Sequence, residues 1–477
     1  MESNNNKTKI VIIGFLFLSI FHFFYSISVI NDGHNWGGDF ALYISQAKAI
    51  VNGTTNTLFE ASKASCEGSF ERMNPDVYPV IFPLMLSPIY VFWGLNFLAF
   101  KVLVICCFII SLAAICIFVY KKIGEFEALL VVGLLATSEF FIGFNNYVLA
   151  DIPAMMWVWI SIIIYMFFDE SSTKLKLIKF ALLGLVLAIA FQTKTLSISV
   201  IVAVLLAELF NYLHTKNSFK ELVLKSFTFI SVFGVVFMLI YLVYPSASSG
   251  YIQQSSKLTV PIIKSNFSYY TNAPSWFLYH SSAFVWLTLP AVILGFFYQF
   301  KKNIFIVILP SVHMLLLVLW PFQEGLRFLI FLVPLYYYFA IIGYNLFFKF
   351  LSQKIKFPNL YSIRFIVLVA IFFFSLFNNY RLYSKNTNNN NEIESAEANE
   401  LFKFVNTQTN INDQFIFFKP NVLRLICNRE SVYLLNSSSI KLSKASYWIF
   451  KKGDKMADTT GLKMVLNNNE FLVFKLK

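Results

Sequence analysis

The sequence predicts a polytopic α-helical membrane protein with a small α/β domain at its C-terminal end. Of its 477 residues, 57% are hydrophobic and only 13% are charged, whereas globular domains carry about a quarter charged residues. Apolar runs long enough to cross a bilayer recur as far as residue 379. Polar linker and strand-like patterns follow. We therefore divide the chain into a membrane domain, 1–379, and a C-terminal domain, 380–477.

The charge and cysteine patterns exclude two other classes. The formal net charge is +13, but no basic cluster lies on a soluble segment. Lysines sorted to cytoplasmic loops explain this charge better than a nucleic-acid partner does. The five cysteines show no metal-ligand spacing.

The first apolar run, 10–30, follows Lys7 and Lys9. A cleavable signal peptide is the competing interpretation, but the run is long and no small-residue cleavage site closes it. We therefore expect a retained first helix with a cytoplasmic N-terminus, followed by a first outer loop, 31–98. Within that loop, 80–93 is too short for a span and is expected to lie along the membrane interface, since a crossing there would place Lys121 and Lys122 outside.

About eleven crossings result, with the C-terminus outside. After the first run, they are expected at about 97–120 and 126–143, in a helix ending at 168, in a hairpin over 180–213, and at 226–244, 281–299, 303–320, 328–348 and 362–379. Most lysine-bearing short loops then fall on the cytoplasmic side, as the positive-inside rule requires.

The C-terminal domain begins with an asparagine-rich linker, 386–391, and an amphipathic helix over 392–405. Four short strands are expected in the rest of the domain, at 414–418, 432–435, 463–466 and 471–474. This segment shows no catalytic constellation.

Asp39 is the first candidate site residue, because it lies in a glycine-rich stretch where the chain leaves the membrane. The glycines Gly37 and Gly38 predict irregular backbone rather than helix, followed by a short amphipathic helix over 43–51. A carboxylate at this position can accept a proton from an attacking hydroxyl. A solvated loop carboxylate, or a cap on the following helix, is the alternative.

Four further charged residues stand at outer turns or interrupt apolar runs. Asp151 precedes Ile152-Pro153, so it is either a helix cap or a second site carboxylate. Lys194 interrupts an apolar block, where a lysine either snorkels or faces a functional cavity. Arg327 suits a phosphate ligand, although Glu324 offers it a plain salt bridge. His34 is expected to be a loop histidine.

The order of these motifs resembles the GT-C superfamily of membrane glycosyltransferases, specifically its protein O-mannosyltransferase and aminoarabinose transferase branch. The matching segments are Gly38–Tyr43, Tyr78–Pro83, Asp151–Pro153, Thr193–Thr195, Arg327–Leu329 and, in the C-terminal domain, Phe418–Val432. The resemblance implies a GT-C fold over nearly the whole chain and an inverting transferase that takes a sugar from a polyprenyl phosphate at the outer membrane face.

The resemblance also implies roles for individual residues. Asp39 would be the catalytic base. The substrate-binding set would comprise Asp151, Tyr43, Tyr78, Lys194, Arg327 and Glu324. These residues do not demand a cofactor or metal, although Asp39 and Asp151 together could hold a divalent ion. Members that modify proteins often carry an Asp-Glu pair in the first loop; here Phe40 follows Asp39, which favours a lipid or glycan acceptor over a protein.

Three alternatives from other classes remain. An outer-face glycan ligase or polymerase would use a diphosphate-linked glycan. A transporter predicts charges near the bilayer midplane and an internal repeat, and a non-catalytic scaffold predicts that Asp39 is dispensable. The asparagine-, lysine- and phenylalanine-rich composition hints at a bacterium, and hence at the inner membrane with the C-terminal domain outside the cytoplasm.

Overall fold

The computed structural model describes residues 2–70, 75–214, 218–244, 255–278, 282–355, 360–386, 391–434, 444–453 and 461–476. The helices before the C-terminal domain are α1 (Glu2–Val29), α2 (Gly38–Asn52), α3 (Thr55–Gly68), α4 (Ile81–Trp93), α5 (Phe97–Lys122), α6 (Glu125–Ala136), α7 (Glu139–Asn145), α8 (Asp151–Phe167), α9 (Thr173–Thr193), α10 (Ile198–His214), α11 (Phe219–Val243), α13 (Val260–Thr271), α14 (Ala273–Phe277), α15 (Ser282–Lys302), α16 (Ile304–Val318), α17 (Val333–Ile355) and α18 (Leu360–Asn386).

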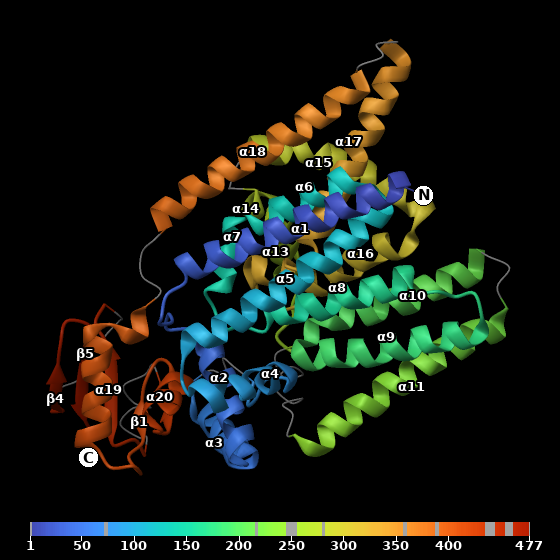
Figure 1. Ribbon diagram of the computed structural model, residues 1–477. Helices are drawn as coiled ribbons and strands as arrows, with labels where there is room; N and C mark the ends of the chain where they lie inside the picture. The colour runs from blue at the N-terminus through green and yellow to red at the C-terminus, as the bar shows by residue number, and fades with distance from the viewer. Residues whose placement is uncertain are drawn as a thin grey trace.

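These helices form a membrane body of long helices, and Figure 1 shows the short helices α2–α4 beside the C-terminal domain at one end of it. Six helices in the described ranges are long and apolar enough to span a bilayer, or seven if α6 and α7 form one broken span. Shorter apolar helices include α4, α8 and α16. The chain is an integral membrane protein, and the total of eleven crossings stays a prediction.

The structure corrects three local predictions. Asp39 does not lie in an irregular loop: α2 begins at Gly38, after Gly37 in an extended conformation, and Asp39 is in its first turn. An acidic residue there interacts favourably with the helix dipole, which offsets the poor helix propensity of glycine. The predicted single helix over 126–143 is two helices, α6 and α7, bent by 55°. The last long helix extends beyond 379, to Asn386.

The C-terminal domain is a mixed sheet covered by helices. Its elements are η3 (Glu392–Glu394), α19 (Ala396–Gln408), β1 (Phe415–Ile416), α20 (Pro420–Cys427), β2 (Ser431–Val432), β3 (Tyr447–Lys451), β4 (Lys463–Asn467) and β5 (Phe471–Lys475). The strand order is β2-β1-β3-β5-β4, parallel from β2 to β3 and antiparallel beyond. The strands predicted at 414–418, 463–466 and 471–474 and the amphipathic helix are present, whereas β3 and α20 were not predicted. The strand predicted at 432–435 overlaps β2 only at Val432, and residue 435 lies outside the described residues. Of the predicted linker, 387–390 lies outside the described residues.

An aromatic cluster joins the first outer loop to this domain. The Trp36 side chain is 5% exposed and packs against the rings of Phe402, Phe417, Phe418 and Phe471 at centroid distances of 5.3–6.0 Å. Aromatic pairs in this range are worth about 0.5–1.5 kcal/mol each beyond their buried area. The cluster therefore holds the loop that precedes Asp39 against the C-terminal domain.

Hydrogen bonds make a second connection, between the end of α3 and β2. Ser65 Oγ donates to the carbonyl of Ser431 at 2.5 Å, and Phe70 N donates to the carbonyl of Tyr433 at 2.8 Å. Arg424 of α20 donates to the carbonyl of Ala61 at 3.1 Å. Backbone acceptors and donors used in this way give the two segments a defined register against one another.

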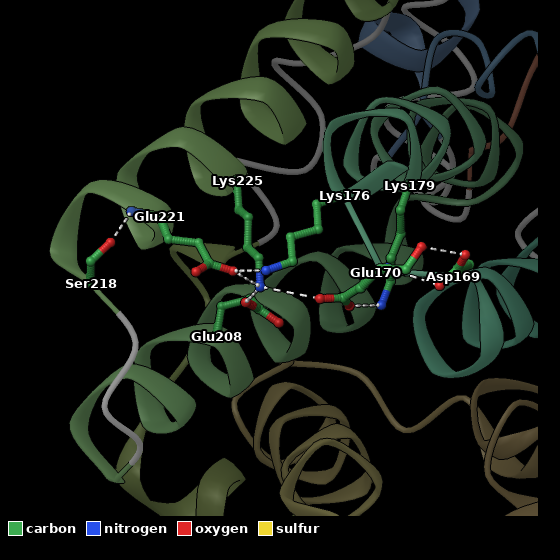
Figure 2. Close-up of polar contacts among 9 residues, drawn as sticks. Asp169, Glu170, Lys176, Lys179, Glu208, Ser218, Glu221 and Lys225 are labelled. Carbon is green, nitrogen blue, oxygen red and sulfur yellow. Dashed lines mark hydrogen bonds and ion pairs between the residues drawn. The ribbon is translucent and has the colours of Figure 1, made fainter. Parts of the chain in front are cut away.

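An ion-pair network joins α9, α10, α11 and the segment before α9 at the end of α9 opposite Lys194 (Figure 2). A helix of 21 residues places the two ends about 30 Å apart. The network comprises Glu170, Lys176, Lys179, Glu208, Glu221 and Lys225. Three lysines meet three glutamates, so its formal charges balance. This balance indicates a structural clamp in which each of the six side chains has a partner of opposite charge.

Lys225→Met is expected to lower the free energy of unfolding by about 3 kcal/mol, because removing one partner of a buried pair leaves the other charge uncompensated. Lys225 Nζ lies 3.2–3.4 Å from Glu170, Glu208 and Glu221, and the Glu208 side chain is only 9% exposed. Thermal denaturation in detergent measures the effect. Lys220→Met, at an exposed lysine of the same helix, is the control. An equal loss of melting temperature in both variants would contradict the clamp.

Candidate active site

Asp39 lies in the first turn of α2 and accepts two hydrogen bonds from distant parts of the chain. The Tyr78 hydroxyl donates to Oδ1 at 2.7 Å, and Arg327 Nη2 donates to Oδ2 at 2.9 Å. Its side chain is 21% exposed. A carboxylate has about four lone-pair sites, so Asp39 is oriented by two donors and still has acceptor capacity for a third.

Asp151 is the first residue of α8 and is almost completely buried. Its Oδ1 accepts from Lys194 Nζ in a short contact and from Arg327 Nε at 3.4 Å. Its Oδ2 has no hydrogen-bond partner among the described residues. Asp151 makes no side-chain capping hydrogen bond at the start of α8, so its carboxylate serves the ion pairs rather than the cap that was the alternative.

Lys194 lies at the break between α9 and the following 3-10 turn, η1 (Thr195–Ser197). Its backbone is extended, with φ −153° and ψ 121°, so the helix ends and the side chain turns inward. The ammonium group also lies 4.5 Å from the centroid of the Phe328 ring. The side chain is only 11% exposed, which argues against snorkelling to the interface.

Arg327 lies in the 3-10 turn η2 (Gly325–Leu329), which begins at Gly325 with φ +65°, a left-handed conformation that favours glycine. Besides Asp39 and Asp151, its Nη1 lies 3.8 Å from Glu324. Burial lowers the pKa of Arg327, but the facing carboxylates Asp151 and Asp39 outweigh burial and raise that pKa above its ordinary value. The guanidinium is thus a permanent positive charge between the two acids.

The two predicted tyrosines form one face of the site. Tyr43 and Tyr78 stack with ring centroids 4.4 Å apart. Gln46, one helical turn after Tyr43, exchanges two hydrogen bonds with the Tyr78 backbone at 2.8 and 2.9 Å. This amide pair fixes the loop before α4 against α2, so that the Tyr78 hydroxyl reaches Asp39.

A buried lysine that the sequence analysis did not single out anchors the loop before Asp39. Lys101 is fully buried, and its ammonium donates to the carbonyls of Asn31 and Gly33 and to Asn146 Oδ1 at 2.6–2.8 Å. All three of its donors are therefore used. The signal was present, because Lys101 interrupts an apolar run as Lys194 does.

His34 is a packed loop residue, as expected. It is 2% exposed and stacks on Phe40 with ring centroids 3.7 Å apart. Burial lowers the pKa of His34 to about 3, so the imidazole is neutral near pH 7. It supports the start of α2 by packing and contributes no charge.

The structure brings all seven predicted site residues together. Asp39, Asp151, Lys194 and Arg327 form one continuous ion-pair chain, with Tyr78, Tyr43 and Glu324 around it. They come from the first loop, α8, the α9–α10 break and η2, the segments that the sequence placed at the outer face. No group of three or more metal-ligating side chains occurs in the described part of the chain.

Two solved proteins that match the chain over most of its length, AglB and ArnT, are both members of the GT-C superfamily of membrane glycosyltransferases. One is the oligosaccharyltransferase AglB from Archaeoglobus fulgidus in complex with an inhibitory peptide and a dolichol-phosphate, with 9% identity, a TM-score of 0.60, and coverage of 92% of this chain and 69% of AglB. Another is ArnT from Cupriavidus metallidurans bound to undecaprenyl phosphate, with 11% identity, a TM-score of 0.57, and coverage of 98% of each chain.

The apo form of ArnT gives a TM-score of 0.60 at 9% identity, again over 98% of each chain. No family model and no curated protein matches the sequence. At these identities the likeness establishes the fold: the chain has the GT-C architecture, and this part of the sequence prediction is confirmed.

Proposed function

We propose that the chain is an inverting glycosyltransferase that moves a sugar from a polyprenyl-phosphate donor to a hydroxyl of an acceptor. The observation that carries the proposal is the chain of ion pairs from Asp39 through Arg327 to Asp151 and Lys194. It joins a partly exposed carboxylate to two cations within a GT-C fold. AglB and ArnT, with the same fold, hold dolichol-phosphate and undecaprenyl phosphate respectively.

The reaction needs one base and one stabilised leaving group. The acceptor oxygen attacks the anomeric carbon, its proton passes to Asp39, and the bond from that carbon to the phosphate oxygen breaks, leaving its electron pair on the phosphate. Arg327 and Lys194 offset the charge that grows on the phosphate. Attack from the face opposite the leaving group inverts the anomeric centre without a covalent intermediate.

Donor binding would also prepare the base. In the structure, Arg327 Nη2 is committed to Asp39 Oδ2 at 2.9 Å. A donor phosphate that competes for the guanidinium would weaken this bond and leave Oδ2 free for the acceptor proton. Because Arg327 and Lys194 already supply two positive charges beside the two acids, the proposed mechanism has no step that needs a metal ion, although Asp39 and Asp151 have the oxygen donors that would hold one.

The proposed orientation places this site outside the cytoplasm. The lysine-bearing ends of α5 and α9 lie away from Asp39, which agrees with a cytoplasmic N-terminus under the positive-inside rule. In a bacterium, the membrane would be the inner membrane. A lipid or glycan acceptor is favoured over a protein, since Phe40 takes the place of the second acid.

The test is turnover by the purified chain in lipid nanodiscs. Radiolabelled undecaprenyl-phosphate hexoses and pentoses are supplied with candidate acceptors, in magnesium and in EDTA. We expect sugar transfer and release of undecaprenyl phosphate, with turnover retained in EDTA. Release from a diphosphate-linked glycan alone would replace the proposal with a ligase or polymerase. An absence of release from every donor, with the protein folded by thermal denaturation, would favour the transporter and scaffold alternatives.

A further inference from the structure

A pocket of about 160 Å³ opens on Asp39 between the first outer loop and the C-terminal domain. At about 30 Å³ per water molecule in the liquid, this volume corresponds to about five waters, which is the scale of one six-membered ring. The first turn of α2, the last turn of α3, the start of α20 and Tyr433 line it. Two parts of the chain that are far apart in sequence therefore build one wall each.

The pocket shares Asp39 with the ion-pair chain but none of the other members of that chain. Arg327, Lys194 and Asp151 are not among the lining residues found in the described part of the chain. Asp39 therefore belongs both to the ion-pair chain, assigned above to the donor phosphate, and to this second space. Inversion requires the attacking hydroxyl and the leaving phosphate on opposite faces of the sugar, so a space that meets the base but not the phosphate-binding cations suits the acceptor.

Lys419 supplies a positive charge to the second space. Its side chain is half-buried and lines the pocket together with Asp39. Within the described residues its ammonium makes no hydrogen bond, ion pair or cation–π contact, whereas the nearby Lys451 is paired with Glu470 at 3.0 Å. Burial lowers the pKa of Lys419, with Asp39 and Glu392 opposing that shift. A partly buried charge without a partner is costly unless a ligand completes it.

Three other polar residues of the lining are already committed to structure. Ser65 donates to a β2 carbonyl, Ser69 Oγ donates to the carbonyl of Ser65 at 2.7 Å, and Asn421 accepts from Arg424 at 3.4 Å. These groups shape the walls and add no second charge. Among the described residues that line the pocket, Lys419 is therefore the one positive charge, and it accompanies the carboxylate of Asp39.

We infer that this pocket is the acceptor site and that it takes an anionic sugar headgroup of a lipid or glycan, with a phosphate or carboxylate held by Lys419 and a neighbouring hydroxyl directed at Asp39. The assignment of this pocket to the acceptor rests on the proposed function. The binding of an anionic headgroup beside Lys419 is expected whether or not the chain turns over a donor.

Cys66 provides a direct readout of occupancy. It lines the pocket as a half-buried cysteine that is not in a disulfide. Cys106 is exposed on α5, while Cys107, Cys116 and Cys427 are buried. In a Cys106→Ser background of the full chain in nanodiscs, the rate of Cys66 labelling by a water-soluble maleimide reports access to the pocket. The probes are dodecyl glucoside, its 6-phosphate and dodecyl glucuronide.

In the protein that keeps Lys419, at least one anionic probe is expected to slow Cys66 labelling about ten-fold. A hydrogen bond to a charged group stabilises the bound probe by an amount that corresponds to about this factor. Dodecyl glucoside should protect little, and Lys419→Met should abolish the difference. The stronger of the two anionic probes identifies phosphate or carboxylate as the preferred group. Lys452→Met, at an exposed lysine after β3, is the matched control and should behave as wild type.

Equal protection by charged and uncharged probes, no protection by any probe, or full protection in Lys419→Met would overturn the inference. Donor turnover is measured on the same samples. Protection without release of undecaprenyl phosphate from any donor would retain the anion site and remove the proposed function, so the two failures are distinguishable.

Discussion

Asp39→Asn is expected to reduce sugar transfer by about 10²–10⁴-fold, the range that positioned acid–base catalysis contributes. The amide keeps the size of the carboxylate and can still accept from Tyr78, whose hydroxyl lies 2.7 Å from Oδ1. It cannot take the proton of an incoming hydroxyl. The loss should appear in kcat, with the KM for the donor little changed, because Lys194 and Arg327 remain in place.

The measurement is release of undecaprenyl phosphate and labelling of the acceptor, wild type beside variant. Asp39 is 21% exposed, so we expect a small change in melting temperature. Tyr78→Phe is the matched control: it removes one orienting hydrogen bond and leaves the base, so it should cost far less. Equal turnover in Asp39→Asn and wild type would remove Asp39 from the mechanism.

The members of this site were predicted from the sequence for different reasons. Lys194 stood out against the cost of a membrane charge, Arg327 suited a phosphate, and the two tyrosines came from the resemblance alone. The positive-inside rule placed the turns of Lys194 and Arg327 on one face with Asp39 and Asp151. The positive-inside rule predicts on which side of the membrane a turn lies, but it does not predict which side chains are in contact. The hydrogen bond between Asp39 and Arg327 joins residues 288 positions apart, and no local pattern encodes it.

The parts that were missed depend on tertiary context. Helix α20 has only eight residues, so its period is too short to recognise, although Pro420 at its start and a left-handed Asn428 at its end are typical helix boundaries. The packing of Trp36 against the aromatic rings of the C-terminal domain could not be predicted either, because aromatic residues are abundant throughout the chain. Lys419 lies in a segment that the sequence analysis noted only for its resemblance to the family. Lys419 and Asp39 line one pocket because the loop that carries Trp36 packs against the C-terminal domain.

Arg327→Lys is expected to lower kcat/KM by about 10²–10³-fold, the cost of removing one preorganised donor from a developing anion. The guanidinium directs three different nitrogens at three acids: Nη2 at Asp39, Nε at Asp151 and Nη1 at Glu324. A lysine keeps the charge but presents one ammonium on a flexible stem, so it cannot bridge Asp39 and Asp151 in a fixed plane. Charge alone is therefore not expected to suffice.

Glu324→Gln removes the negative charge from the most distant of the three carboxylates around the Arg327 guanidinium. The Nη1–Oε2 distance is 3.8 Å and the Glu324 side chain is 34% exposed, so this pair should contribute under about 1 kcal/mol and the variant should stay within a few-fold of wild type. Donor kinetics and melting temperatures of both variants distinguish the two-carboxylate contact of Arg327 from its charge alone.

If Arg327→Lys kept more than a tenth of wild-type kcat/KM, the bridge between the two carboxylates would be structural, and the phosphate would have to be held by Lys194. A large loss in Arg327→Lys beside a near-normal Glu324→Gln would instead identify the planar, two-carboxylate contact as the element that couples donor binding to release of the base.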